Sequence, residues 1–219
     1  MRQPIQLADP IPQFGSLVQL RAKLHGDGCQ RCTLGFQPEI NGCCVSRGDI
    51  SGNTRRMIIG EAPGKEEDAK RSPFTGPAGR LMDDIFRCVG LEPERDFYLG
   101  NVVKCRPYLP KGSGKENFTP KVEQQKLCRP FIDQEIRILQ PKLIVLLGKI
   151  AVENVLPELK GQTMGSLRGR VIKKEDITYF IMIHPAAILH ASRDPDLELQ
   201  YKQQTWDDIR ALKILMEKE

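Results

Sequence analysis

Residues 57–64 read Met-Ile-Ile-Gly-Glu-Ala-Pro-Gly, and this stretch decides how the chain is expected to fold. Its apolar start, Met57 to Ile59, has the composition of a short buried strand. The glycines and the proline that follow favour a tight turn and prevent the strand from continuing. The turn leaves Glu61 at the carboxyl end of the strand, where open α/β sheets bind their ligands.

A second turn, Ser72 to Pro77, presents one aromatic ring, Phe74. The segment from Gly79 to Gly90 is predicted to be a helix, because apolar residues recur in it at four-residue spacing. A strand end, a carboxylate and a ring therefore come from one segment. On spacing alone, a solvated Glu61 and a core position for Phe74 remain open.

Three further apolar stretches are predicted to be strands: residues 97–103, 143–148 and 179–184. Helical segments separate them, which favours an α/β fold, a three-layer αβα sandwich with a central four-stranded parallel sheet. Asn101 lies near the carboxyl end of one strand and His184 ends another, as Glu61 follows its own. We therefore expect these three side chains to meet at one edge of the sheet.

The chain is expected to form one domain, residues 16–219, after a flexible N-terminal segment, residues 1–15. Pro130 is expected to separate two helices, since proline is unfavourable inside a helix. The first of them would end near Cys128, and the second would run from Phe131 to Leu139.

The composition excludes some classes of protein. The longest apolar run, Leu143 to Leu147, is far too short to span a membrane. The N terminus has no hydrophobic signal-peptide region, so a cytoplasmic protein is expected. A net charge of +5, from 33 basic and 28 acidic residues, is compatible with nucleic-acid binding without being diagnostic of it.

The seven cysteines favour a metal or cluster site over disulfides, because their number is odd and no export signal is evident. A Cys-x-x-Cys pair and two distant cysteines can form a cage of four thiolates: Cys29, Cys32, Cys105 and Cys128. Such a cage suits a four-iron cluster or a structural zinc ion, and thiolate chemistry alone does not choose between them. Buried thiols without a metal, and ligation by Cys43 or Cys44, also remain open, while Cys88 is predicted to lie in the core.

Six blocks of sequence complete the pattern: Gly60-Glu-Ala-Pro-Gly64, Pro73-Phe-Thr-Gly-Pro-Ala-Gly79, Asn101-Val-Val-Lys-Cys-Arg-Pro107, Cys128-Arg-Pro130, Pro141-Lys-Leu-Ile-Val-Leu-Leu-Gly148 and His184-Pro-Ala-Ala-Ile-Leu189. They occur in the order found in family 4 uracil-DNA glycosylases, the iron–sulfur members of their superfamily. The chain resembles this family over about residues 16 to 215, and six ordered blocks are far more specific than any single one.

The resemblance implies a glycosylase that acts on DNA, with a structural [4Fe–4S] cluster held by the four cysteines of the cage. It implies that Phe74 stacks on the flipped uracil and that Asn101 reads the edge of the base. It also implies that His184 stabilises negative charge on uracil O2.

The same resemblance assigns roles to residues around the first turn. Gly60, Glu61 and Ala62 match the loop that contacts the base and the attacking water. Glu67 matches an acidic position that would crowd the C5 face of the base and exclude thymine.

These residue types suit the chemistry. A base inside a duplex must be flipped out before an enzyme can reach it. The amide of Asn101 would accept from uracil N3–H and donate to O4, whereas cytosine would leave a buried donor unpaired at a cost of about 1–3 kcal/mol. A neutral His184 donating to O2 would stabilise the uracil anion as the bond breaks, and Glu61 would orient water.

Contacts with the DNA itself are predicted at five positions. Lys104, Arg106 and Lys111 are expected to contact phosphates. Ile188 or Leu189 is expected to wedge into the vacated base stack. DNA is the expected partner of a monomeric protein, and the sequence carries no readable signal for a sliding clamp or a polymerase.

The chain departs from the family pattern in two places. Residues 109–119 replace a shorter turn and contain no histidine, so the covalent capture known from a related group with such a histidine is not expected. Lys65 stands where an acidic residue is common, which bears on how water is positioned.

The sequence therefore predicts a monofunctional uracil-DNA glycosylase that leaves an abasic site without cutting the strand, since no lysine holds a clear Schiff-base position. One alternative is a catalytically weak or inactive iron–sulfur module that binds DNA or senses damage. Another is a zinc-stabilised phosphoryl-transfer enzyme that uses carboxylates near Glu61, although no P-loop or His-rich metal pattern supports it.

Overall fold

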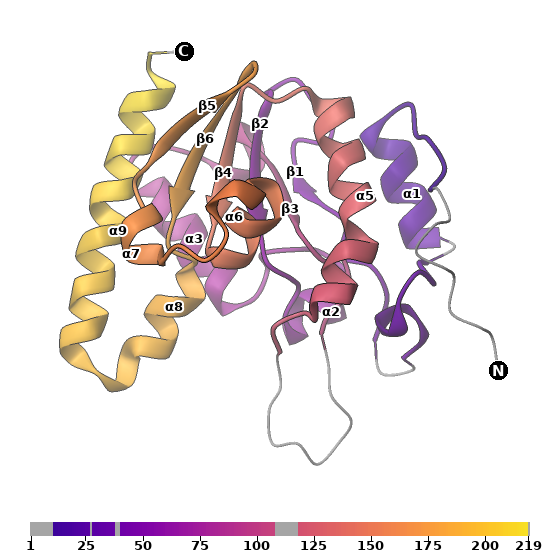
Figure 1. The fold of residues 1–219 in the computed structure, drawn as a ribbon, viewed down its shortest axis with the longest axis horizontal. Coiled ribbons are helices and arrows are strands. Elements are labelled where there is room, and N and C mark those ends of the chain that lie inside the picture. Colours follow the sequence, from indigo (N-terminus) through magenta and orange to yellow (C-terminus); the bar gives the residue numbers. More distant parts are fainter. Residues whose placement is uncertain (1–10, 27, 38–39, 108–117, 219) are drawn as a thin grey trace.

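The computed structural model describes residues 11–26, 28–37, 40–107 and 118–218. The helices in these ranges are α1 (Leu17–Gly26), α2 (Lys65–Lys70), α3 (Pro77–Arg87), α4 (Pro93–Asp96), α5 (Val122–Leu139), α6 (Lys149–Val155), α7 (Met164–Leu167), α8 (Pro185–His190) and α9 (Pro195–Met216). The strands are β1 (Arg47–Gly48), β2 (Arg56–Gly60), β3 (Tyr98–Asn101), β4 (Leu143–Leu147), β5 (Val171–Lys174) and β6 (Ile177–Met182). Figure 1 shows the sheet at the centre of the molecule, with α9 on one side and α5 and α1 on the other.

The sheet has the strand order β1-β3-β2-β4-β6-β5. Its four central strands, β3, β2, β4 and β6, are parallel, which confirms the predicted parallel sheet. The two edge strands, β1 and β5, pair antiparallel and were not predicted. β1 is only two residues long, and β5 is mostly exposed, so neither carries the apolar run of a central strand.

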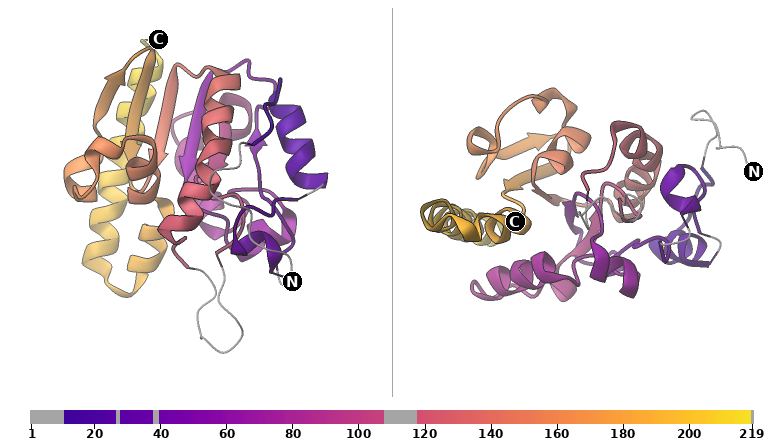
Figure 2. Two further views of the ribbon diagram at one scale, coloured as in Figure 1. Left: turned by 45° about the vertical axis from the view of Figure 1, so that its right-hand side comes forward. Right: turned by 90° about the horizontal axis from the view of Figure 1, so that it is seen from below.

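Helices cover both faces of the sheet because successive side chains of a strand point in opposite directions. Ile58 packs in a core with α3 and α9, whereas Met57 and Ile59 pack in a second core with α1, α5 and α6. The view from below in Figure 2 shows α3 and α9 on one side of the sheet and α5 on the other. The predicted three-layer αβα architecture is therefore confirmed.

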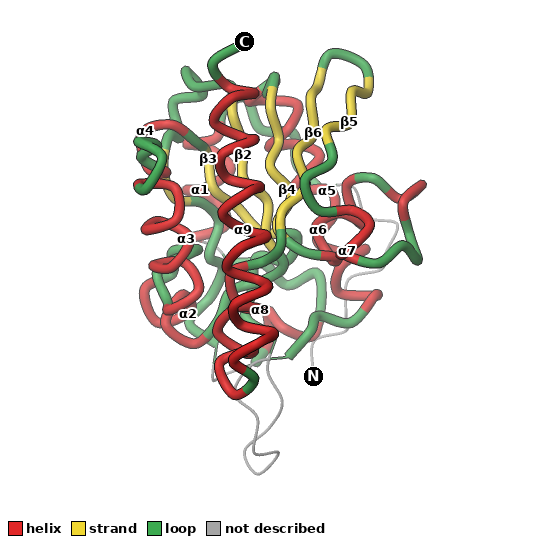
Figure 3. Tube along the Cα trace, turned by 90° about the vertical axis from the view of Figure 1, so that its left-hand side faces the viewer, coloured by secondary structure: helices red, strands yellow, loops and turns green. Residues whose placement is uncertain are grey.

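The parallel register brings the carboxyl ends of the central strands to one edge. Gly60 of β2 lies beside Asn101 of β3, and Leu147 of β4 lies beside Met182 of β6. In Figure 3, α9 runs across the front of the strands and α8 lies beyond their ends. Residues that follow these strands therefore surround one region, as the sequence predicted.

The predicted break at Pro130 is wrong, because α5 continues through this residue. A proline inside a helix costs about 3 kcal/mol. Burial of Phe131 and Ile132 against the core outweighs that cost. The missing N–H of Pro130 deprives the carbonyl of Lys126 of its helical donor, and the neighbouring carbonyl of Leu127 accepts a hydrogen bond from the Arg31 guanidinium at 3.3 Å.

The predicted core position of Cys88 is wrong. This residue is exposed, because it ends α3 on the side away from the buried Phe86. In the N-terminal segment, residues 1–10 lie outside the described residues, and Phe14 is buried, with its backbone hydrogen-bonded to Gln134 and Arg137 of α5. No helix in the described ranges is long and apolar enough to cross a membrane.

Candidate active site

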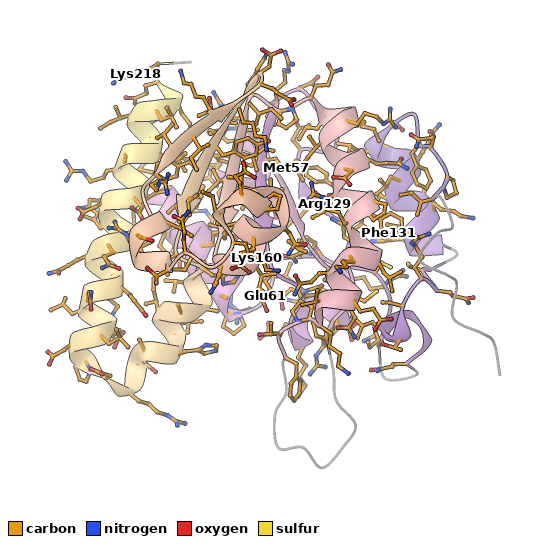
Figure 4. All side chains as sticks on the ribbon, viewed as in Figure 1. Met57, Glu61, Arg129, Phe131, Lys160 and Lys218 are labelled. Atoms are coloured by element: carbon orange, nitrogen blue, oxygen red, sulfur yellow. The ribbon has the colours of Figure 1, made fainter. Side chains whose placement is uncertain are left out.

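A cavity of about 620 Å³ opens at the carboxyl ends of the parallel strands. Its walls come from the loop after β2, from α2, from the turn before α3, from the end of β3 and from α8. Six residues predicted to act in catalysis or to contact the base line it: Glu61, Ala62, Glu67, Phe74, Asn101 and His184. In Figure 4, Met57 lies within the sheet and Glu61 lies below it, where β2 has ended.

Asn101 is the last residue of β3 and is only 2% exposed. Its Oδ1 atom is buried and has no hydrogen-bond partner within the described part of the protein. A buried acceptor without a partner costs free energy, so native structures rarely keep one without a reason. Since Asn101 lines the cavity, a ligand bound there can supply the missing donor.

Phe74 forms another wall of the cavity and is buried. Its ring lies close to Gly60, where a Cβ atom would come within 2.8 Å of Phe74 Cζ and 2.6 Å of Asn101 Oδ1. Only a glycine therefore leaves room for the ring and the amide together. Phe74 itself has a φ of +58°, a left-handed conformation that bulky residues rarely adopt.

His184 precedes α8 and faces the cavity from the end of β6. Its Nδ1 atom accepts a hydrogen bond from the backbone N–H of Ala186 at 3.2 Å. In the neutral imidazole the proton therefore lies on Nε2, which remains a donor. Burial, together with the nearby charge of His190, lowers the pKa of His184 to about 4, so the ring is neutral at pH 7.

Glu61 follows β2 and is half-buried in the cavity wall. Burial raises the pKa of its carboxyl, and a hydrogen bond from the Thr119 side chain acts in the opposite direction. Thr119 and its neighbour Phe118 also line the cavity and were not predicted as site residues. The only signal for them in the sequence was their position at the end of the unusually long segment 109–119.

Glu67 joins the two turns that form the cavity. Its Oε1 atom accepts from the backbone N–H of Gly76 at 2.6 Å, and its Oε2 atom accepts from Gly64 at 3.1 Å. These two bonds use both carboxylate oxygens to hold the loop after β2 against the turn before α3. The predicted crowding of a base by Glu67 stays a prediction.

The four cysteines of the predicted cage line one internal cavity: Cys29, Cys32, Cys105 and Cys128. Burial raises the pKa of the Cys128 thiol, so a thiolate at that position needs a nearby positive charge such as a metal. In the described ranges, no three His, Cys, Asp or Glu side chains are arranged to hold a single metal ion. Four thiols around one cavity are the kind of ligand set that iron–sulfur clusters and structural zinc ions use.

The remaining cysteines of this region have their own contacts. Cys43 Sγ lies 3.6 Å from Cys105 Sγ, and the thiol of Cys44 donates to the carbonyl of Glu67 at 3.1 Å. Cys43 is therefore a fifth thiol beside the cage, whereas Cys44 supports α2.

Several predicted DNA contacts do not match the structure. Lys104 is 1% exposed and pairs with the buried Glu135 at 2.6 Å, so its predicted role as a phosphate contact is wrong. Arg106 is also buried, and its charge faces Asp68 rather than solvent. Lys104 therefore pairs with α5, and Arg106 lies near α2.

Of the two residues predicted to wedge into the base stack, only Leu189 is exposed. Ile188 is 3% exposed and packs inside the protein, whereas Leu189 is 39% exposed and lines the cavity. The predicted phosphate contact Lys111 lies outside the described residues.

Comparison with known proteins identifies the family of this chain. A family model described as the uracil DNA glycosylase superfamily matches residues 47–210. The chain therefore belongs to the uracil-DNA glycosylase superfamily, a class of DNA N-glycosylases.

Relatives within that superfamily identify the branch. A type-4 uracil-DNA glycosylase of Thermotoga maritima is 34% identical, over 87% of this chain and 91% of the relative. Enzymes of the same name from Sulfurisphaera tokodaii (34% identical, 85% and 80% covered) and Archaeoglobus fulgidus (33% identical, 67% and 71% covered) are also similar. The predicted resemblance to family 4 is confirmed.

Proposed function

We propose that this chain hydrolyses the N-glycosidic bond of deoxyuridine in DNA, releases uracil and leaves an abasic site. The observation that carries the proposal is the buried Oδ1 atom of Asn101, which has no partner among the described residues and lies in a cavity that also contains the Phe74 ring and a neutral His184. An amide, a ring and an imidazole donor around one space suit a flat heterocycle that carries both donors and acceptors.

Asn101 would select uracil. Its Oδ1 accepts from N3–H, and its amide N–H donates to O4. Cytosine offers an acceptor at N3 and a donor at the exocyclic position, so both partners would be wrong and about 1–3 kcal/mol would be lost for each unpaired group. The Phe74 ring holds the base by stacking without distinguishing one base from another.

His184 would stabilise the leaving group. When the glycosidic bond breaks, negative charge develops on uracil O2 and positive charge on the sugar. The Nε2–H of the neutral ring would be the donor to such an anion, and the bond from Ala186 to Nδ1 favours this tautomer. Loss of a comparable oxyanion donor costs about 10²–10³-fold in rate in other enzymes.

Glu61 would orient water and favour the sugar cation, and its half-buried carboxylate lies at the same wall. A weak nucleophile is sufficient, because an oxocarbenium-like sugar reacts readily with water. Glu67 would close the C5 side of the base and so exclude thymine. Release of thymine by a Glu67→Ala variant, with uracil release retained, would support that role.

We further propose that Cys29, Cys32, Cys105 and Cys128 hold a [4Fe–4S] cluster, as the family implies. Their common cavity and their buried thiols fit such a group. The cluster would be structural, since it ties the segment before β1 to β3 and α5.

The protein would contact DNA through the rim of the cavity, with Leu189 as the wedge. We propose that it acts as a monomer in the cell, where genomic DNA lies. We also propose that it does not cut the strand. Because Lys65 lines the cavity, borohydride trapping of wild type and Lys65→Ala on uracil-containing DNA tests that proposal.

The decisive experiment measures release of uracil from an end-labelled oligonucleotide under single-turnover conditions. Asn101→Ala and His184→Ala are each expected to slow release at least a hundredfold, whereas the exposed control Asn53→Ala is expected to match wild type. Equal, background-level release by all four proteins would refute glycosylase activity and favour a DNA-binding module.

A further inference from the structure

Arg47 lies on the edge strand β1, and its guanidinium contacts both the turn that carries Phe74 and helix α3. Its Nη1 donates to the carbonyl of Phe74 at 2.8 Å, and its Nη2 pairs with Asp83 of α3. Its Nε lies 3.5 Å from an Oε1 of Glu94 in α4. The side chains of Arg47 and Asp83 are both 11% exposed, so this ion pair is largely shielded from solvent.

The residue that Arg47 holds is strained. Phe74 has a φ of +58°, which places its Cβ close to its own backbone and is unfavourable for any residue except glycine. Such a conformation persists only where the surroundings fix it. Helix α3 packs directly on the Phe74 carbonyl, because a Cβ on Gly79 would lie 2.0 Å from that oxygen.

This backbone conformation decides where the ring points. With the carbonyl turned toward Arg47, the ring lies over Gly60 and beside Asn101. In an ordinary right-handed or extended conformation the side chain would leave the chain in another direction. Arg47 itself does not line the cavity, so any effect on a bound base passes through Phe74.

We propose that Arg47, oriented by Asp83, is a positioning residue for the Phe74 ring in base binding. The proposal rests on the proposed function, in which that ring stacks on the flipped base. The planar guanidinium is needed because one side chain must donate to a carbonyl and a carboxylate on two elements at once. A lysine carries its charge on one atom and cannot span both with the same geometry.

The test is a double-mutant cycle with Arg47→Lys and Phe74→Leu, measured as single-turnover uracil release. Arg47→Lys is expected to slow release about tenfold or more in the wild-type background, because a small misplacement of a substrate-contacting group is costly. In the Phe74→Leu background the same substitution is expected to change the rate less than twofold, since the ring it positions is gone.

Arg168→Lys provides a matched control. Arg168 also pairs with a buried carboxylate, Asp208, and donates to a backbone carbonyl, that of Gln204 at 2.6 Å. Both Arg→Lys variants are expected to lower the melting temperature, and only Arg47→Lys is expected to lower the rate of the folded enzyme.

Two results would overturn the proposal: a wild-type rate for Arg47→Lys, or an equal loss of rate in both backgrounds. A wild-type rate for Phe74→Leu would instead refute the role of the ring in the proposed function. If Phe74→Leu is too slow to follow, a crystal structure of Arg47→Lys decides. If Phe74 in that variant keeps its left-handed backbone conformation, with its ring against Gly60, the proposed role of Arg47 is refuted.

Discussion

Replacing Gly60 by alanine tests the geometry of the cavity with a single methyl group. The new Cβ would lie 2.6 Å from Asn101 Oδ1 and 2.8 Å from Phe74 Cζ, whereas ordinary contact begins at 3.4 Å. The amide oxygen would have to retreat by about 0.8 Å and the ring by about 0.6 Å. The backbone itself tolerates alanine, because Gly60 is not in the left-handed region.

The expected effect follows from these displacements. A misplacement near 1 Å costs about 10²-fold in rate when it moves a group that orients the substrate. Overpacking of a buried site costs about 1–3 kcal/mol in stability. For a domain of this size, each kcal/mol lowers the melting temperature by about 2–4 °C.

The assay is single-turnover uracil release, well below the melting temperature of the variant, together with thermal unfolding. Gly165→Ala is the control, because its Cβ would meet nothing nearer than Thr163 Oγ1 at 4.0 Å. We expect a loss of about a hundredfold for Gly60→Ala and none for Gly165→Ala. A Gly60→Ala enzyme that is folded and as fast as wild type would show that the ring and the amide do not act together on the base.

Three further predictions follow from contacts in and beside the cavity. The pKa of His184 is about 4, below its usual value near 6.5, so the unfolded chain binds this proton between those pH values and the folded chain does not. The stability of the wild-type protein should therefore fall as the pH falls through that window. Denaturant titrations at pH 7 and pH 5 should show a smaller loss of unfolding free energy for His184→Gln than for wild type. A protonation near pH 6.5 that limits uracil release by the wild-type enzyme would contradict the neutral ring. Cys105→Ser should lose iron and visible absorbance, whereas Cys43→Ser should retain both. The opposite result would show that Cys43, and not Cys105, is a cluster ligand. Glu67→Gln should cost about 1–3 kcal/mol in unfolding free energy, because the amide oxygen can replace only one of the two accepting oxygens and the N–H₂ group that replaces the other cannot accept a hydrogen bond. Unchanged stability would contradict the two bonds.

The residues that meet at the cavity could be predicted where their signal was local. Glu61, Asn101 and His184 each follow an apolar run, and the parallel register then brings them to one cavity. Two of the four cysteines that line the internal cavity, Cys29 and Cys32, carry a short-range signal, because the Cys-x-x-Cys pair is itself a local pattern.

The environment of other residues could not be predicted in this way. From the sequence, Lys104 is expected to be a surface cation next to a strand end, yet it is buried and forms an ion pair with Glu135 of α5. Arg47 reads as a residue of an irregular segment, yet it pairs with Asp83 of α3. In both cases the partner lies more than thirty positions away, so no local pattern signals the contact.

The sequence by itself determined the order of the central strands along the chain, the turns that end them and the residues placed at those ends, because apolar runs and glycine or proline breaks act over a few neighbouring residues. Only the tertiary structure decided which charges are buried, which histidine nitrogen carries the proton and how α5 continues through Pro130. Burial and pairing depend on elements that meet only after folding, and their free energies are large enough to override the local preference of a single residue.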